Sequence, residues 1–385
     1  MLSPRRVTSA SAIPLAILCN RLFHSRPLIR RSILYDFLPQ YPTWFTNRGH
    51  TAAKIRYLHK LRSEYSLETL RECPYCGGSD FTLLATQERS GLPTRVVLCT
   101  ACCLVFTNPR LSEAALVDHY QDDYRRIERG DRPDLHQFMF DLQGSKGPVL
   151  WDFITQAGAT FNGDASMLDI GCGEGGLLQW FSANSNLSKV SGFELNKEAA
   201  TYGLQQGLDI RQTPFTKSDD TYDLVVLEQV LEHLSSPDDL LSTIARSQTA
   251  GAWLFIGVPG LLNFSTSYDH NFIAYLQYGH MVHYCLHTLE RLVTKHGYRL
   301  VRGNEIVRAL FQRTENTTRI LTTPPLQAAA LTDLLLNSER IFSRRGSLLR
   351  NNWDHYRAYG ILLFKSWLQS MVPDSQVSQS STVKL

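Results

Sequence analysis

Short apolar runs alternate with amphipathic segments between residues 167 and 258. Short apolar runs bounded by glycine or polar residues predict buried strands, whereas apolar positions three or four residues apart predict helices. The predicted strands are 167–170, 190–194, 224–227 and 253–258, and the predicted helices between them are 177–183, 197–206 and 238–246. This alternation predicts an α/β fold, in which a parallel sheet carries helices on both faces.

The same patterns assign elements on either side of this region. Residues 51–70 and 112–160 have helical character, and residues 326–342 have the apolar spacing of an amphipathic helix. Further strands are predicted at 298–307 and 359–364. Residues 373–385 are rich in Ser and Gln, and we expect this tail to be disordered.

Composition and charge exclude several classes of protein. The chain has 385 residues, of which 43% are hydrophobic and 19% charged, as in an ordinary globular protein of two or three domains. Its longest apolar runs are far shorter than the ~20 residues that a membrane span needs. Residues 1–35 hold six arginines and no acidic residue, so the net charge of +3 conceals a slightly acidic body. We therefore expect no nucleic-acid partner, because such binding needs a basic face.

The basic N-terminal arm leaves three interpretations open. An arginine-rich, acid-free start is typical of a transit peptide, and also of an arm that contacts an anionic lipid surface. It is equally compatible with a basic extension of a cytoplasmic protein. We expect a cytoplasmic location, with organelle targeting or peripheral membrane contact as the alternatives.

Five of the eight cysteines fall within one short stretch. Cys73 and Cys76 form one CxxC pair, Cys99 and Cys102 form a second after 22 intervening residues, and Cys103 follows directly. Two such pairs can offer four thiolates to a tetrahedral zinc ion, which predicts a zinc ribbon with a closed, structural site. The spacing favours Cys102 as the fourth ligand, but Cys103 remains an alternative. Buried reduced thiols or a thioredoxin-type pair would be the non-metal interpretation.

A glycine-rich turn follows the first predicted strand of the α/β region. Gly171, Gly173 and Gly176 satisfy the GxGxxG pattern of dinucleotide-binding turns, a match that is weak by itself. A diphosphate needs backbone N–H groups without nearby anions, yet Asp169 lies two residues before the first glycine and Glu174 lies inside the turn. These carboxylates favour a ligand with a cationic amine and sulfonium, namely S-adenosylmethionine. Glu194, at the end of the next predicted strand, is expected to accept both ribose hydroxyls.

Three segments carry a resemblance to a known family. LDIGCGEGG at 168–176 with GFELN at 192–196 resembles motifs I and II of class I S-adenosylmethionine-dependent methyltransferases, and residues 223–234 and 251–258 resemble the fourth and fifth strands. The resemblance covers about residues 165–300 and implies a Rossmann-like seven-stranded sheet. It also implies the roles of seven cofactor-binding residues. Asp169, Gly171 and Gly173 are expected around the methionine moiety, Glu194 at the ribose and Phe215 beside the adenine. Glu228 and Gln229 are expected to close the pocket at the end of the fourth strand.

A zinc ribbon before such a domain resembles sugar C-methyltransferases and relatives from surface-polysaccharide clusters. Residues 104–110 strengthen the likeness, and the segment 279–285 resembles the E-H-x-x-Y-F-S run of that group. The resemblance places His280 on the histidine base of the group and His283 where the group has tyrosine, whereas Gly279 replaces its glutamate. His280 is the first candidate base, because an imidazole pKa of ~6.5 suits proton removal near neutrality.

The remaining candidates complete the predicted acceptor site and domain plan. His233 is the second candidate base or only a helix cap, and His283 and Tyr284 lie beside His280 in the sequence. We expect methyl transfer to a small polar acceptor, a sugar or sugar-linked metabolite, at carbon or oxygen. Alternatives are an O- or N-methyltransferase of another natural product and a non-catalytic binding or assembly factor.

The expected divisions are 1–60 extension, 61–125 zinc ribbon, 126–164 helical connector, 165–300 methyltransferase core, 301–370 strands with a helical insertion, and 371–385 tail.

Overall fold

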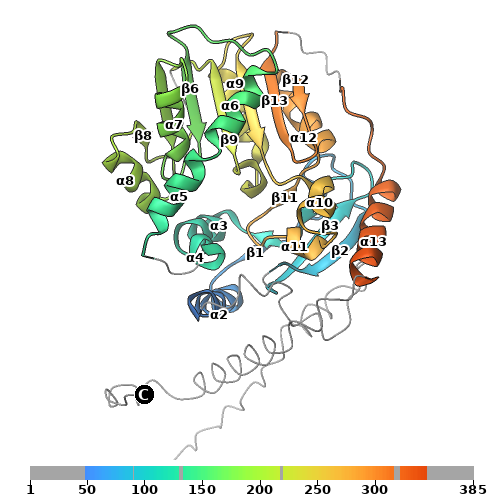
Figure 1. Ribbon diagram of the computed structural model, residues 1–385. Helices are drawn as coiled ribbons and strands as arrows, with labels where there is room; N and C mark the ends of the chain where they lie inside the picture. Colours follow the sequence, from blue (N-terminus) through green and yellow to red (C-terminus); the bar gives the residue numbers. More distant parts are fainter. Residues whose placement is uncertain (1–47, 90, 130–132, 217–219, 316–320, 345–385) are drawn as a thin grey trace, which may run out of the picture.

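The computed structural model describes residues 48–89, 91–129, 133–216, 220–315 and 321–344. The basic arm at 1–35, the strand predicted at 359–364 and the tail lie outside the described residues. Two sheets dominate the described part, a large one and a small one, with the helices of the N-terminal half beside them (Figure 1). Among the described residues, no helix combines the length and apolar character needed to cross a membrane.

The large sheet has seven strands in the order β12-β13-β10-β9-β6-β7-β8. Its parallel part is β6 (Ser166–Ile170), β7 (Lys189–Phe193), β8 (Ile210–Arg211), β9 (Leu224–Glu228) and β10 (Trp253–Gly257). β12 (Tyr298–Gly303) and β13 (Arg308–Arg313) form an antiparallel hairpin that pairs with β10. The predicted α/β, Rossmann-like seven-stranded sheet is therefore confirmed, and this hairpin makes it mixed.

The segment predicted as one strand at 298–307 forms a shorter strand followed by a turn. β12 ends at Gly303, and Val307 takes a positive φ of 57° before β13 begins. Asn304 closes the turn, since its carbonyl accepts from Val307 N at 3.0 Å and its Oδ1 accepts from Arg308 N at 3.1 Å. Val307 is nevertheless fully buried, although it lies in the turn and not in a strand.

Helices cover both faces of the large sheet because successive strand residues point to opposite faces. Leu224 and Val226 pack with residues of α6 (Gly147–Thr155) and α7 (Gly176–Asn184). Val225 and Leu227 pack with residues of α9 (Pro237–Arg246) and α12 (Leu286–Val293). Two further helices, α5 (Leu135–Gly144) and α8 (Lys197–Gln205), contact α7 and β8, respectively.

The small sheet includes one of the paired cysteines, Cys99, and one strand from far along the chain. β2 (Phe81–Gln87), β3 (Pro93–Cys99) and β4 (Val105–Thr107) form an antiparallel meander, and β11 (Val282–His283) pairs with β4. Leu331 and Leu335 of α13 (Ala328–Arg344) pack against this sheet in one apolar cluster.

Short elements connect the two sheets on the N-terminal side. The helix predicted over 51–70 is α2 (Arg48–Ser63), which ends before β1 (Leu67–Glu68) pairs with β5 (Arg110–Leu111). α3 (Glu113–Asp118), the π-helix η1 (His119–Asp123) and α4 (Tyr124–Arg129) follow. Beyond β9 and β10, the short elements are η2 (Leu231–His233), η3 (Leu261–Asn263), α10 (Phe264–Ser267), α11 (Phe272–Tyr275) and η4 (Thr294–His296).

Candidate active site

The glycine turn lies where β6 ends and α7 begins. Gly171 and Gly173 have positive φ values of 75° and 58°, which favour glycine. Space is also limiting, because a Cβ at Gly173 would lie 2.2 Å from Gln143 Nε2 and one at Gly171 would lie 2.6 Å from Val230 Cγ2. The backbone of the turn therefore lies so close to neighbouring segments that these two positions have no room for a side chain.

Three carboxylates gather at the carboxyl ends of adjacent parallel strands. Asp169 is on β6, Glu194 follows β7, and Glu228 ends β9. Asp169 is only 2% exposed, and burial raises its pKa well above the usual range, with Glu228 and Glu194 adding to the effect. Lys146 Nζ partly balances the group by pairing with Glu228 Oε1 at 2.8 Å. A cationic ligand beside Asp169 would favour its ionised form.

Glu194 is held by backbone donors on both sides. Gly173 N donates to Oε2 at 2.8 Å and Asn196 N donates to Oε1 at 2.6 Å. Burial raises the pKa of Glu194, and these two hydrogen bonds oppose the rise. The carboxylate is thus fixed next to the glycine turn, and its remaining lone pairs can accept from a vicinal diol.

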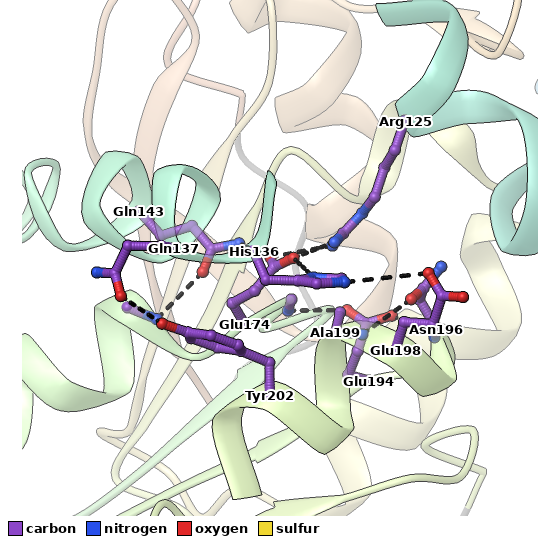
Figure 2. A network of polar contacts seen from close by, with 12 residues as sticks. Arg125, His136, Gln137, Gln143, Glu174, Glu194, Asn196, Glu198, Ala199 and Tyr202 are labelled. Atoms are coloured by element: carbon purple, nitrogen blue, oxygen red, sulfur yellow. Dashed lines mark hydrogen bonds and ion pairs between the residues drawn. The ribbon is translucent and has the colours of Figure 1, made fainter. Parts of the chain in front are cut away.

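Glu174, which we expected to repel a diphosphate, does not face a ligand site. It is fully buried, ion-paired with Arg125 of α4, and accepts from Gln143 Nε2 at 3.1 Å (Figure 2). His136 Nδ1 lies 2.9 Å from its Oε1. The charge of Glu174 is therefore balanced inside the protein, and Asp169 with Glu194 carries the argument for a cationic ligand.

The remaining predicted cofactor residues differ in exposure. Phe215 is buried and packs edge-on against Phe193 at a ring distance of 5.0 Å, as part of the apolar core. Gln229 follows Glu228 with a positive φ of 61° and donates from its N–H to Gly257 O at 2.7 Å. Such backbone strain in a non-glycine residue is concentrated at functional sites.

The histidines predicted for the acceptor side lie together and are buried. The rings of His233 and His280 are 4.8 Å apart and those of His280 and His283 are 6.0 Å apart. Burial lowers the pKa of His233 to about 4, that of His283 to about 3, and that of His280 well below its usual range. All three imidazoles are therefore neutral at pH 7. Tyr284, also fully buried, lies beside them in the chain, and burial raises its pKa.

A buried acid completes this cluster. Glu232 Oε1 lies 3.7 Å from His233 Nε2, and ligand atoms of Glu232, His233 and His280 lie within 4.8 Å of one another. Neither carboxyl oxygen of Glu232 has a hydrogen-bond partner among the described residues, and burial raises its pKa to about 8. A carboxyl group with two imidazoles can hold a divalent cation or share protons.

Sequence reasoning missed the π-helix residues that contact these histidines. Tyr120 OH is hydrogen-bonded to His233 Nδ1 and donates to Gly279 O at 2.7 Å. His119 is 2% exposed and packs on Tyr120 and Tyr57. A Cβ at Gly279 would lie 2.9 Å from His119 Nε2. The charged, helical pattern of residues 112–160 gives no signal for this contact, because it depends on tertiary packing.

The four predicted cysteine ligands form one cluster. The Sγ atoms of Cys73 and Cys102, and those of Cys76 and Cys99, are 3.6 Å apart, and all four lie within 4.8 Å of one another. Zinc bonds of ~2.3 Å in a tetrahedron separate the sulfurs by ~3.8 Å, so this donor set fits the ion. Cys103 instead has a φ of 63° and donates from Sγ to Leu326 O at 3.3 Å. The geometry favours Cys102 as the fourth ligand.

Comparison with known proteins identifies the domain that contains the glycine turn. Residues 142–302 match the family model described as a methyltransferase domain. The chain carries a methyltransferase domain. Its sheet order and mixed hairpin are the Rossmann-like fold of that class.

Curated relatives share part of this domain. A ubiquinone biosynthesis O-methyltransferase of Aeromonas salmonicida is 32% identical over 138 residues, which cover 33% of this chain and 53% of the relative. The corresponding enzyme of Caulobacter vibrioides is 36% identical over 109 residues, covering 26% and 42%. The chain thus spans about half the length of the curated relatives it matches.

Solved structures resemble the chain more distantly. The magnesium protoporphyrin IX methyltransferase of Synechocystis PCC 6803 with bound SAH is 13% identical, covers 53% of this chain and all of its own, and has a TM-score of 0.39. The plantazolicin methyltransferase in complex with SAH is 16% identical, covers 60% of this chain and 89% of its own, and also has a TM-score of 0.39.

Proposed function

We propose that the protein transfers a methyl group from S-adenosylmethionine to a small polar acceptor. The observation that carries this proposal is the set of carboxylates at adjacent strand ends around the glycine turn, within the methyltransferase domain. In this proposal Asp169 and the turn at Gly171 and Gly173 bind the methionine moiety, and Glu194 accepts from the ribose hydroxyls. Glu228 and Gln229 close the pocket, and Phe215 borders the adenine.

His280 is the proposed general base. As the acceptor atom attacks the methyl carbon, the carbon–sulfur bond breaks, the sulfonium becomes a neutral thioether, and the acceptor proton moves to His280. His280 is buried and neutral at pH 7, so it can accept a proton. Glu232, whose ligand atom lies within 4.8 Å of that of His280, can stabilise the imidazolium as a carboxylate after its own proton has passed to solvent. His233, held by Tyr120, is the second candidate for the role.

The proposed acceptor is a sugar or sugar-linked metabolite, methylated at carbon or oxygen. The resemblance of the cysteine module (residues 61–125, which contain the four clustered cysteines) and of the segment 279–285 to sugar C-methyltransferases supports this choice. A second candidate is a phenolic or hydroquinone hydroxyl, which is favoured by the names of the curated relatives. For both acceptors, the half-buried ring of Tyr120 and the buried rings of His233 and His280 offer aromatic faces and neutral hydrogen-bonding groups.

The cysteine module is proposed to hold one structural zinc ion through Cys73, Cys76, Cys99 and Cys102. The donor set and spacing support zinc. Four thiolates leave no open coordination position, so zinc would contribute to folding and not bind the acceptor.

Mass spectrometry with S-adenosylmethionine that carries a labelled methyl group tests the proposed function. The full chain is incubated with a panel of nucleotide sugars and a panel of catechols and hydroquinones. Label in a sugar supports the first acceptor, and label in a phenol supports the second. Cofactor binding without transfer to any member of an acceptor panel extended to amines would favour the binding or assembly factor instead.

A further inference from the structure

The strand that follows His280 belongs to the sheet of the cysteine module. β11 pairs with β4 through Val282 opposite Phe106 and His283 opposite Val105. The remaining strands of this sheet, β2, β3 and β4, all come from residues 81–107. The segment that carries the proposed base therefore leads directly into a strand of the module's sheet.

The peptide units at His280 and Met281 are held from both sides. Met281 N donates to Glu232 O at 2.7 Å, which fixes it to the methyltransferase domain. From the module, Thr107 N donates to Met281 O at 3.0 Å and Thr107 Oγ1 donates to His280 O at 2.8 Å. Thr107 is 4% exposed, so these hydrogen bonds are buried. If they are lost, the carbonyl groups have no water molecule to replace the missing donor.

The same module connects Thr107 to two of the four cysteines, Cys99 and Cys102, within a few residues. β3 ends at Cys99, whose N–H donates to Leu104 O at 2.9 Å, and β4 then runs from Val105 to Thr107. Cys99 therefore closes the turn that leads into β4. Thr107 lies one short strand away from two of the metal-binding candidates.

We propose that Thr107 is a positioning residue that fixes the backbone of His280 to the cysteine module, so that the state of the four-cysteine site controls acceptor chemistry but not cofactor binding. The inference rests on the proposed function of His280. The cofactor residues are independent of this contact, because Asp169 and Glu194 lie at the carboxyl ends of β6 and β7, and Glu194 accepts from Gly173 N and Asn196 N of the methyltransferase domain.

A pair of variants at Thr107 tests the inference. Thr107→Val keeps the side-chain shape and removes the hydroxyl, whereas Thr107→Ser keeps the hydroxyl. The matched control is Thr294→Val, because Thr294 is similarly buried and donates from Oγ1 at 2.8 Å to Glu290 O within its own segment. We expect Thr107→Val to lower kcat about tenfold or more, since small misplacements of a catalytic group are costly. Affinity for S-adenosylhomocysteine should be unchanged, and Thr107→Ser should restore kcat.

Hydrogen–deuterium exchange supplies a readout that does not depend on activity. Amides of residues 279–285 should exchange at least tenfold faster in Thr107→Val, and in wild-type protein stripped of metal, but not in Thr294→Val. Unchanged exchange in this segment, or unchanged kcat in Thr107→Val, would overturn the inference. Failure of the proposed function is seen separately, as absence of methyl transfer by the wild type, and the exchange experiment still decides whether the module holds the segment.

Discussion

Arg125 neutralises a glutamate that lies inside the glycine turn. Its guanidinium pairs with both carboxylate oxygens of Glu174, which is fully buried. Arg125 comes from α4, outside the methyltransferase domain at 142–302, and its partner immediately precedes α7. The pair therefore attaches the N-terminal helices to the turn that we propose binds the cofactor.

Arg125→Met should destabilise the protein by about 3 kcal/mol, because it leaves a buried carboxylate without its cation. Affinity for S-adenosylmethionine should fall as well, since the glycine turn loses the ion pair that attaches it to α4. Urea unfolding and calorimetry measure the two effects. Adding Glu174→Gln should restore most of the stability, and the control Arg302→Met, which removes contacts to Phe153 and Gln156, should cost much less. A double variant as unstable as the single one would contradict this explanation.

Asp169→Ala and Glu194→Ala should each weaken S-adenosylmethionine binding at least tenfold, about 1.4 kcal/mol. Asp169 supplies charge beside the cationic ligand, and Glu194 supplies the acceptors for the ribose. Glu198→Ala is the matched control, because that side chain is near Glu194 in sequence but largely exposed. Titration calorimetry with full-length protein gives the affinities. Tight NADH binding without S-adenosylmethionine binding would reject the cofactor proposal.

Protein purified without chelators should contain one zinc ion per chain. Cys73→Ser should lose both the metal and much of the soluble yield, since a structural zinc site contributes directly to folding. Cys103→Ser is the control in the same module, and it should keep the metal because Cys103 Sγ contacts Leu326 O instead of the cluster. Metal analysis of the three proteins checks this. A metal retained by soluble Cys73→Ser would point to Glu232, His233 and His280 as its ligands.

His280→Ala should lower turnover by roughly 10²–10⁴ and leave cofactor affinity almost unchanged. His59→Ala, at an exposed position on α2, is the control. The pH profile of kcat/KM gives a second test. The neutral imidazole is the active form, so activity is lost as pH falls through its pKa. Because burial lowers that pKa, the acidic limb should lie below pH 6.5 and should be absent in the variant.

If the variant retains full activity, the role of base passes to His233 or to a tyrosine. An acidic limb at or above pH 6.5 in the wild type would contradict the neutral, buried state of His280. In either case the resemblance of residues 279–285 to the C-methylating group would concern the fold alone.

Much of the large sheet follows from local pattern. Four strands and three helices between residues 166 and 257 lie within about one residue of their predicted ends, because short buried strands and amphipathic helices have distinct periods. The two CxxC pairs likewise predicted the cysteine cluster, because two such pairs can offer four thiolates to one metal ion. Gly171 and Gly173 sit at the positive φ that their residue type suggests.

Only the tertiary structure determined which partners the charged and aromatic side chains contact. Sequence placed Glu174 in the turn, but only packing brought Arg125 and His136 to it, so its charge acts inside the protein. The sequence also pointed to His280. However, strand β4, which bonds the backbone of this segment, and the π-helix residues His119 and Tyr120 come from distant parts of the chain. Local periodicity carries no information about such pairings, because they are set by which surfaces bury each other when the two sheets pack.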